Sequence, residues 1–327
     1  MPVNFKKYLR YQSKAEETVV YDELVAEYDL FRGRKGVRKI DEAVVAEIDD
    51  FLVLASFASR QPSICVGWDF ANDQVYSKIY RGNRSVPDVT EDVRDGLIDI
   101  SDFKPFIQPA YDAYYAHPAR DSIRQALYRI TRIQKTITER TFVSLYSAIE
   151  TLVYEFRRQQ DFEFAVAAQE QWKKLKKKLK KAVAAVAKED EALASVPSRR
   201  EYLYDKLDEL NRISFARALK AFYAHYAVDI SDLWPLTGVE TSLSDIRNKL
   251  VHGYRFEPSS WPMLMSAHEN LRLISERTIL AMLGWPINRS TADSRFLSLH
   301  NNLYKTWRVD WKKLTSLLNN ETTVPDE

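Results

Sequence analysis

A short stretch near residue 250 combines side chains that suit work on a phosphodiester. Residues 247–252 read Arg-Asn-Lys-Leu-Val-His, and they supply a permanent cation, a carboxamide and an imidazole. On an α-helix a four-residue step places Asn248 and His252 on one face. Arg247 lies about 100° round the helix from Asn248, so its long side chain must reach over to meet the imidazole. The stretch ends at Gly253.

These residue types suit cleavage of RNA without a metal, because the 2′-hydroxyl of RNA is an internal nucleophile. Arg247 carries a planar fork of donors that matches phosphate oxygens. The imidazole of His252 is suited to acid or base catalysis, and we expect it to protonate the departing 5′-oxygen. Asn248 would hold the imidazole or contact the phosphate. The alternative is structural: an Arg and a His on one helix often form an ion pair or a cap.

Neither a metal site nor a cofactor is expected. The sequence has no HExxH or CxxC motif and no two histidines four positions apart. The single cysteine, Cys65, excludes an internal disulfide. His225 and His268 lie in mainly apolar helical patterns and are predicted to be structural, and His117 and His300 receive no role.

The length and composition indicate an ordinary globular protein. The chain has 327 residues, 45% hydrophobic and 29% charged, so two domains and a substantial core are expected. Only 8 glycines and 12 prolines occur among many charged helix formers, which favours a mainly α fold. No run of eighteen apolar residues is present, and the first residues lack a signal-peptide core, so we expect a cytoplasmic protein without a membrane partner.

The first part of the chain predicts a small α+β domain over residues 1–118. A helix is expected over 41–60, and two runs rich in β-branched and aromatic residues predict a β-hairpin over 63–81. A proline-punctuated region with one or two short helices then leads to the boundary. Before residue 40 only short stretches such as Thr18–Tyr21 suggest strands.

The rest of the chain is predicted to be almost entirely helical. Apolar residues recur at three- and four-residue steps over 120–134, 141–160, 169–193, 197–226, 262–283 and 303–318. We assign residues 119–285 to a helical bundle and residues 286–327 to a carboxy-terminal helical extension with a frayed end.

Two stretches of the chain resemble the HEPN superfamily, in particular the Apea-like HEPN proteins of bacteria. Residues 142–150, FVSLYSAIE, resemble the first bundle helix of that family, and residues 245–253, DIRNKLVHG, resemble its R-N-x-x-V-H-G signature. A pair of helices lies between them and a closing helix follows. The similarity covers about residues 120–285.

The resemblance implies an antiparallel helical bundle that dimerises with two R-x4-6-H turns facing each other. Many members of the family are metal-independent endoribonucleases in toxin–antitoxin, CRISPR and abortive-infection systems. The expectation is therefore a homodimeric RNase with Arg247, Asn248 and His252 in its site, acting as a toxin or antiviral effector beside an antitoxin or defence partner. Glu150 would orient Arg247 or accept the 2′-hydroxyl proton, or would only pair with Arg247. The alternative is a non-catalytic HEPN module that binds RNA, a nucleotide or a partner protein.

A run of lysines concentrates positive charge on one predicted helix. Seven of the nine residues 173–181 are lysines, and without them the net charge of +2 would become −5. One interpretation is a solvated helix face, and the other is an electrostatic guide for the RNA backbone. A membrane-surface role is disfavoured because the apolar stripe is narrow and rich in alanine. The lysines concerned are Lys173, Lys174, Lys176, Lys177, Lys178, Lys180 and Lys181.

Three tyrosines cluster shortly before the predicted domain boundary. Tyr111, Tyr114 and Tyr115 fall within five residues of one another. Aromatic rings can stack on unpaired RNA bases. Packing in the core or between domains is the interpretation that we favour.

Overall fold

The computed structural model describes most of the chain. The described residues are 4–14, 17–27, 37–65, 67–71, 76–81, 96–131, 139–189 and 197–321. Contacts divide the protein into two compact units, Met1–Glu47 and Ile48–Glu327. This division does not coincide with the predicted boundary at residue 118.

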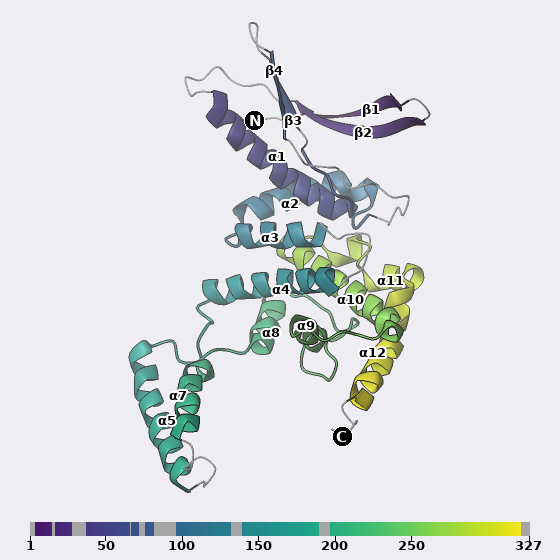
Figure 1. Cartoon of the computed structure of the whole chain (residues 1–327). Coiled ribbons are helices and arrows are strands. Elements are labelled where there is room, and N and C mark those ends of the chain that lie inside the picture. The colour runs from purple at the N-terminus through teal and green to yellow at the C-terminus, as the bar shows by residue number, and fades with distance from the viewer. Residues whose placement is uncertain are drawn as a thin grey trace. The chain divides into compact units, whose positions relative to one another are not determined.

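The first unit contains a long β-hairpin. Strand β1 (Asn4–Lys14) pairs antiparallel with β2 (Glu17–Glu27) (Figure 1). The sequence indicated strand only around Thr18–Tyr21, so most of this hairpin was not predicted. Helix α1 (Val37–Ser59) begins in this unit, four residues before the predicted start, and continues into the second.

The second unit holds a shorter hairpin near its start. Strand β3 (Gly67–Ala71) pairs antiparallel with β4 (Tyr76–Tyr80), and both strands fall inside the predicted range 63–81. The four residues that join them lie outside the described part of the chain.

The protein is mainly helical, as the composition predicted. After β4 come α2 (Ile100–Ala116), α3 (Arg120–Thr131), α4 (Glu139–Gln159), α5 (Gln169–Glu189), α7 (Pro197–Leu210), α8 (Phe215–His225), α9 (Leu243–Val251), α10 (Trp261–Met282), α11 (Ser294–His300) and α12 (Asn302–Glu321) (Figure 1). Two 3-10 turns flank α10, at Pro258–Ser260 and Ile287–Arg289. Among the described helices, none combines the length and the apolar character that a membrane span requires.

A single hydrophobic core runs through the second unit. It extends from the second half of α1 to α12, with no break at residue 118. Helix α4 buries a stripe that includes Phe142, Leu145, Ile149 and Phe156, because these residues recur at three- and four-residue steps. Helix α10 packs against α3, α4 and α12, and α4 also packs against α8 and α9. The core therefore fixes α9 against α4.

One predicted helix is interrupted. The range 197–226 forms two helices, α7 and α8, with the break at residues 211–214. The buried amide of Asn211 bonds both the N–H of Val166 (2.8 Å) and its carbonyl (3.1 Å), which fixes the chain outside a helix. Ser214 then caps α8 by accepting from the backbone N–H of Arg217. The contacts of Asn211 come from a residue 45 positions away and are invisible to periodicity.

The carboxy-terminal segment belongs to the same core. Helix α12 packs against α10, and its Trp307, Leu314 and Leu318 are buried. The short α11 was not predicted. Residues 286–321 are therefore part of the packed body of the second unit rather than an appendage to it.

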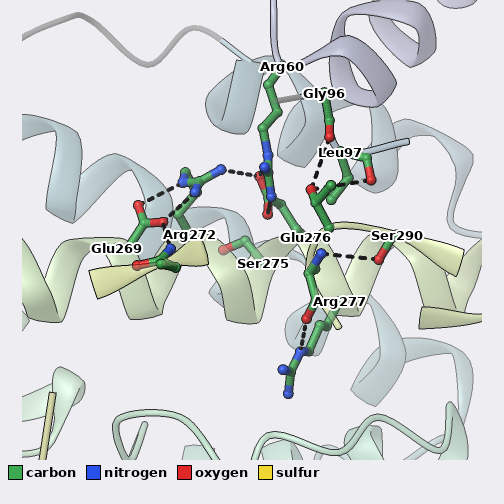
Figure 2. Close-up of polar contacts among 12 residues, drawn as sticks. Arg60, Gly96, Leu97, Glu269, Arg272, Ser275, Glu276, Arg277 and Ser290 are labelled. Carbon is green, nitrogen blue, oxygen red and sulfur yellow. Dashed lines mark hydrogen bonds and ion pairs between the residues drawn. The ribbon is translucent and has the colours of Figure 1, made fainter. Parts of the chain in front are cut away.

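Helix α10 carries a buried row of charged side chains (Figure 2). Arg272 bonds both Glu269 and Glu276, which lie one turn away on either side. Glu276 also accepts two hydrogen bonds from Arg60 at the end of α1. Arg277 pairs with Asp232 at 2.5 Å. Because each buried charge has a partner, the row is compatible with a folded core, and it ties α10 to segments far away in the sequence.

Candidate functional site

Local sequence fixes the start and the orientation of α9. Ser242 and Asp245 form a capping box, in which the Asp245 carboxylate accepts from the N–H of Ser242 at 3.0 Å. Leu243 and Ile246 are fully buried and anchor one face of the helix. With this face anchored, Arg247 and Asn248 lie toward the accessible side of α9, while Leu250 packs against the core.

Arg247 and Glu150 come together from α9 and α4. The guanidinium Nη2 lies 3.1 Å from Glu150 Oε1 and 3.3 Å from Oε2. The second guanidinium nitrogen, Nη1, donates to Asn248 Oδ1 at 3.1 Å. The side chains of Arg247 and Glu150 are 27% and 34% exposed, so the pair is open to solvent. Three of the four predicted site residues therefore form one connected cluster.

Tyr146 extends this cluster beneath the guanidinium. Arg247 Cζ lies 5.8 Å from the centroid of the Tyr146 ring, within the range of a cation–π contact. Burial raises the pKa of Tyr146 to about 12, so its hydroxyl stays protonated near neutrality. Tyr146 was not predicted to be a site residue. Its position one helical turn before Glu150 is the signal that could have identified it.

His252 lies at the C-terminal end of the same helix. It is the C-cap residue of α9, and its backbone N–H donates to the carbonyl of Asn248 at 3.0 Å. Its side chain is exposed and forms no hydrogen bond with the described residues. The guanidinium of Arg247 is turned toward Glu150 and Asn248 instead, so the predicted contact between Arg247 and the imidazole is not formed. Gly253 follows with a φ of 82° and lets the chain leave the helix.

A shallow hollow of about 450 Å³ adjoins the cluster. Asn248 and Lys249 of α9 line one side of it, and Leu318 near the end of α12 lines another. The ammonium of Lys249 lies 4.6 Å from the ring centroid of Tyr254. Glu240 and Asp245 also line the hollow, so it offers carboxylate, amide, cationic and apolar groups next to Arg247.

The other histidines are held by packing. His268 is buried in the core, 6.5 Å from the ring of Phe142, and His225 packs on Phe156 at 5.3 Å. His117 accepts a hydrogen bond from the N–H of Ala119, and burial lowers its pKa, with a smaller contribution from His225. The burial of His268 fits the partly buried, structural role predicted for it, whereas His225 is exposed and fits that prediction only through its ring contact with Phe156.

The tyrosine cluster is divided between core and surface. Tyr114 is fully buried and cannot stack on a base. Tyr115 is 51% exposed, and its ring lies against Tyr111 at 6.1 Å and beneath Arg120 at 4.1 Å. The predicted role in packing is therefore confirmed for Tyr114, whereas Tyr115 remains half-exposed.

The lysine run lies on α5, and three of its members have partners. Lys173 pairs with Glu170 on the same helix, and Lys176 pairs with Asp208 of α7 at 2.6 Å. The ammonium of Lys180 lies 5.1 Å from the ring centroid of Tyr204, also on α7. The remaining four, Lys174, Lys177, Lys178 and Lys181, are exposed and form no ion pair with the described residues.

Comparison of the chain with protein-family models, with curated proteins and with solved structures gave no match. The resemblance to the HEPN superfamily therefore stays a prediction that depends on the motif residues. Within the described ranges, no group of three or more His, Cys, Asp or Glu side chains is placed to hold a metal ion.

Proposed function

We propose that this protein is a metal-independent endoribonuclease of the HEPN type. The observation that carries the proposal is the cluster of Arg247, Glu150 and Asn248 on an accessible surface, with the exposed His252 on the next turn of the same helix. A fixed cation and an exposed imidazole, both carried by this helix and its C-cap, supply two of the functions that metal-free cleavage of RNA needs.

In the proposed reaction Arg247 binds the scissile phosphate. Its guanidinium is already oriented by Glu150 and Asn248, so little rotamer freedom is lost when a phosphate binds. The side chain must then exchange part of its contact with Glu150 for contacts with phosphate oxygens. Glu150 acts as a positioning residue, and the amide nitrogen of Asn248 is available to the phosphate.

His252 supplies the proton for the leaving group. The 2′-oxygen attacks phosphorus and releases its proton to water, and the P–O5′ bond breaks as the protonated imidazole donates to the 5′-oxygen. The products are a 2′,3′-cyclic phosphate and a 5′-hydroxyl. The imidazole is exposed and makes no competing hydrogen bond with the described residues, which leaves it accessible to the substrate.

We propose further that two copies of the chain associate through their bundles, so that two α9 helices face each other across one cleft. The half-exposed Val251, next to His252, is an apolar group that such pairing would cover. A dimeric RNase of this kind would act as a toxin or antiviral effector, held inactive by an antitoxin or another defence protein.

A second candidate function is a non-catalytic module that binds RNA, a nucleotide or a partner protein. The observation that favours it is that Arg247 and His252 do not contact each other through a hydrogen bond, and that Glu150 already neutralises the charge of Arg247. Such a module would bind phosphate through Arg247 without cutting the chain.

Incubation of the purified protein with RNA, followed by mapping of the ends, separates the two functions. Nuclease activity predicts cyclic-phosphate ends, unchanged by a chelator, and loss of cleavage in His252→Ala. The matched control is His300→Ala, because His300 is also exposed and lies at the end of a helix, α11. RNA binding without cleavage would favour the module. Equal cleavage by His252→Ala and the parent protein would exclude the proposed mechanism.

A further inference from the structure

The lysines of α5 are divided by the packing of that helix against α7. Lys176 and Lys180 face α7, where they contact Asp208 and Tyr204, and Trp172 donates to the same aspartate at 3.2 Å. Helices α5 and α7 lie side by side (Figure 1). The three residues recur at four-residue steps, so they share the side of α5 that faces α7.

The other lysines form a separate row on the opposite side. Five of them lie roughly 100–200° round the helix from Lys176, because successive residues of an α-helix are about 100° apart. All five are exposed, and none forms an ion pair with the described residues. We call this row the outward stripe. It consists of Lys174, Lys177, Lys178, Lys181 and Lys188.

We propose that the outward stripe binds the sugar–phosphate backbone of single-stranded RNA. The charge of the stripe is complementary to a linear anion, because Lys188 lies fourteen positions after Lys174 and the stripe therefore runs about 21 Å along the helix axis. The rest of the chain is mildly acidic once the lysine run is set aside, so this field is concentrated on one helix face. The choice of RNA as the anion rests on the proposed function.

The surroundings of the stripe favour a nucleic acid over a membrane surface. The exposed apolar residues of α5, Leu175 and Val186, lie about 120–140° round the helix from the middle of the stripe. A helix that enters a lipid interface needs its apolar face between its flanking cations. In α5 part of the helix surface packs against α7, which leaves less of it available to a lipid interface. The contacts expected are therefore electrostatic and independent of base sequence.

Two triple variants test the proposal. Lys174→Gln/Lys178→Gln/Lys181→Gln removes three charges from the outward stripe, whereas Lys173→Gln/Lys176→Gln/Lys180→Gln removes three paired or α7-facing lysines from the same helix. The probe is a short 2′-O-methyl oligoribonucleotide, which cannot be cleaved, so its binding is measured whether or not the protein is a nuclease. Circular dichroism verifies that both variants are folded.

The outward variant should bind more weakly, and the slope of log affinity against log salt should become shallower by about 2, because each phosphate contact with a single strand contributes roughly 0.7. The matched variant should change the slope far less, and Lys174→Arg/Lys178→Arg/Lys181→Arg should retain binding. Equal effects of the two glutamine variants, loss of binding in the arginine variant, or tighter binding to phosphatidylserine vesicles than to the oligoribonucleotide would each overturn the proposal.

Discussion

The guanidinium of Arg247 lies 3.1 Å from the carboxylate of Glu150, although 97 residues separate them in the sequence. Helices α9 and α4 pack against each other, and the pair forms on the accessible side of that contact. The carboxylate fixes the direction of the guanidinium and is itself fixed by its position on α4. The consequence for function is that the pose of Arg247 depends on Glu150.

We predict that Glu150→Gln lowers the rate of RNA cleavage mainly through kcat, because Arg247 loses its orienting partner. The pair is about one-third exposed, so its loss should cost less than about 1 kcal/mol of stability. Glu150→Asp should restore part of the rate. The control is Glu155→Gln, which removes a carboxylate paired with Arg158 on the same helix. A purely structural pair would leave kcat unchanged in Glu150→Gln.

A second prediction concerns Gly253, whose φ of 82° favours glycine. Nothing lies within 4 Å of a β-carbon built there, so Gly253→Ala should cost only backbone strain, about 1–2 kcal/mol. The matched control is Gly284→Ala, with a φ of 71° and equal space after α10.

Both substitutions should lower the melting temperature by similar amounts. Only Gly253→Ala should also lower the cleavage rate, because it displaces the turn that carries His252. A parallel loss of activity in the two variants would attribute the effect to stability alone.

The stability of the protein in acid should depend on Glu269. Burial alone would raise the pKa of this carboxyl, but its charge and hydrogen-bond contacts with Arg272, together with a bond from Asn301, hold it down to about 2. Because the folded pKa lies below the ordinary value of 4.5, the stabilisation is complete above about pH 4.5 and is lost as the pH falls toward 2.

Melting temperatures measured across that range should show this loss in the parent protein, and Glu269→Gln should flatten it while lowering stability at neutral pH. Glu170→Gln is the control, since its side chain is 77% exposed. An unchanged acid profile in Glu269→Gln would contradict the prediction.

Removal of Arg272 should be among the most damaging single changes in the chain. Its guanidinium is 6% exposed and satisfies both Glu269 and Glu276, so Arg272→Met leaves two buried carboxylates short of a partner. We expect a loss of about 3–5 kcal/mol in chemical denaturation. Arg158→Met, which removes an exposed guanidinium paired with Glu155, should have little effect. A similar small loss for both would show that the row on α10 contributes no more than a surface pair.

The helices whose ranges were predicted well from the sequence are those with a regular apolar stripe. The spacing of Phe142, Leu145 and Ile149 predicts α4, and the same pattern predicts α5 and α10. The break between α7 and α8 was missed because Asn211 is held there by Val166, 45 residues away. Periodicity within a segment carries no information on such contacts.

The candidate site was predicted in type but not in every contact. The family resemblance predicted that Glu150 could pair with Arg247, and the structure shows this pair. Spacing along one helix instead led us to expect Arg247 against the imidazole of His252, which is the C-cap residue of α9. The charged row of α10 was missed for a related reason. Glu276 is compatible with a buried helix because it pairs both with Arg272 on the same helix and with Arg60, 216 residues away, and the second contact is not visible in the local sequence.

The packing of the α5–α7 hairpin predicts which part of the protein unfolds locally first. Neither helix contributes to the main hydrophobic core, and among their described side chains only Ala187 and Leu207 are buried. So few apolar contacts give the hairpin a small free energy of local unfolding, independent of the rest. Backbone amides of α5 and α7 should therefore exchange with deuterium well before those of α10, and limited proteolysis should first cut the chain in this hairpin.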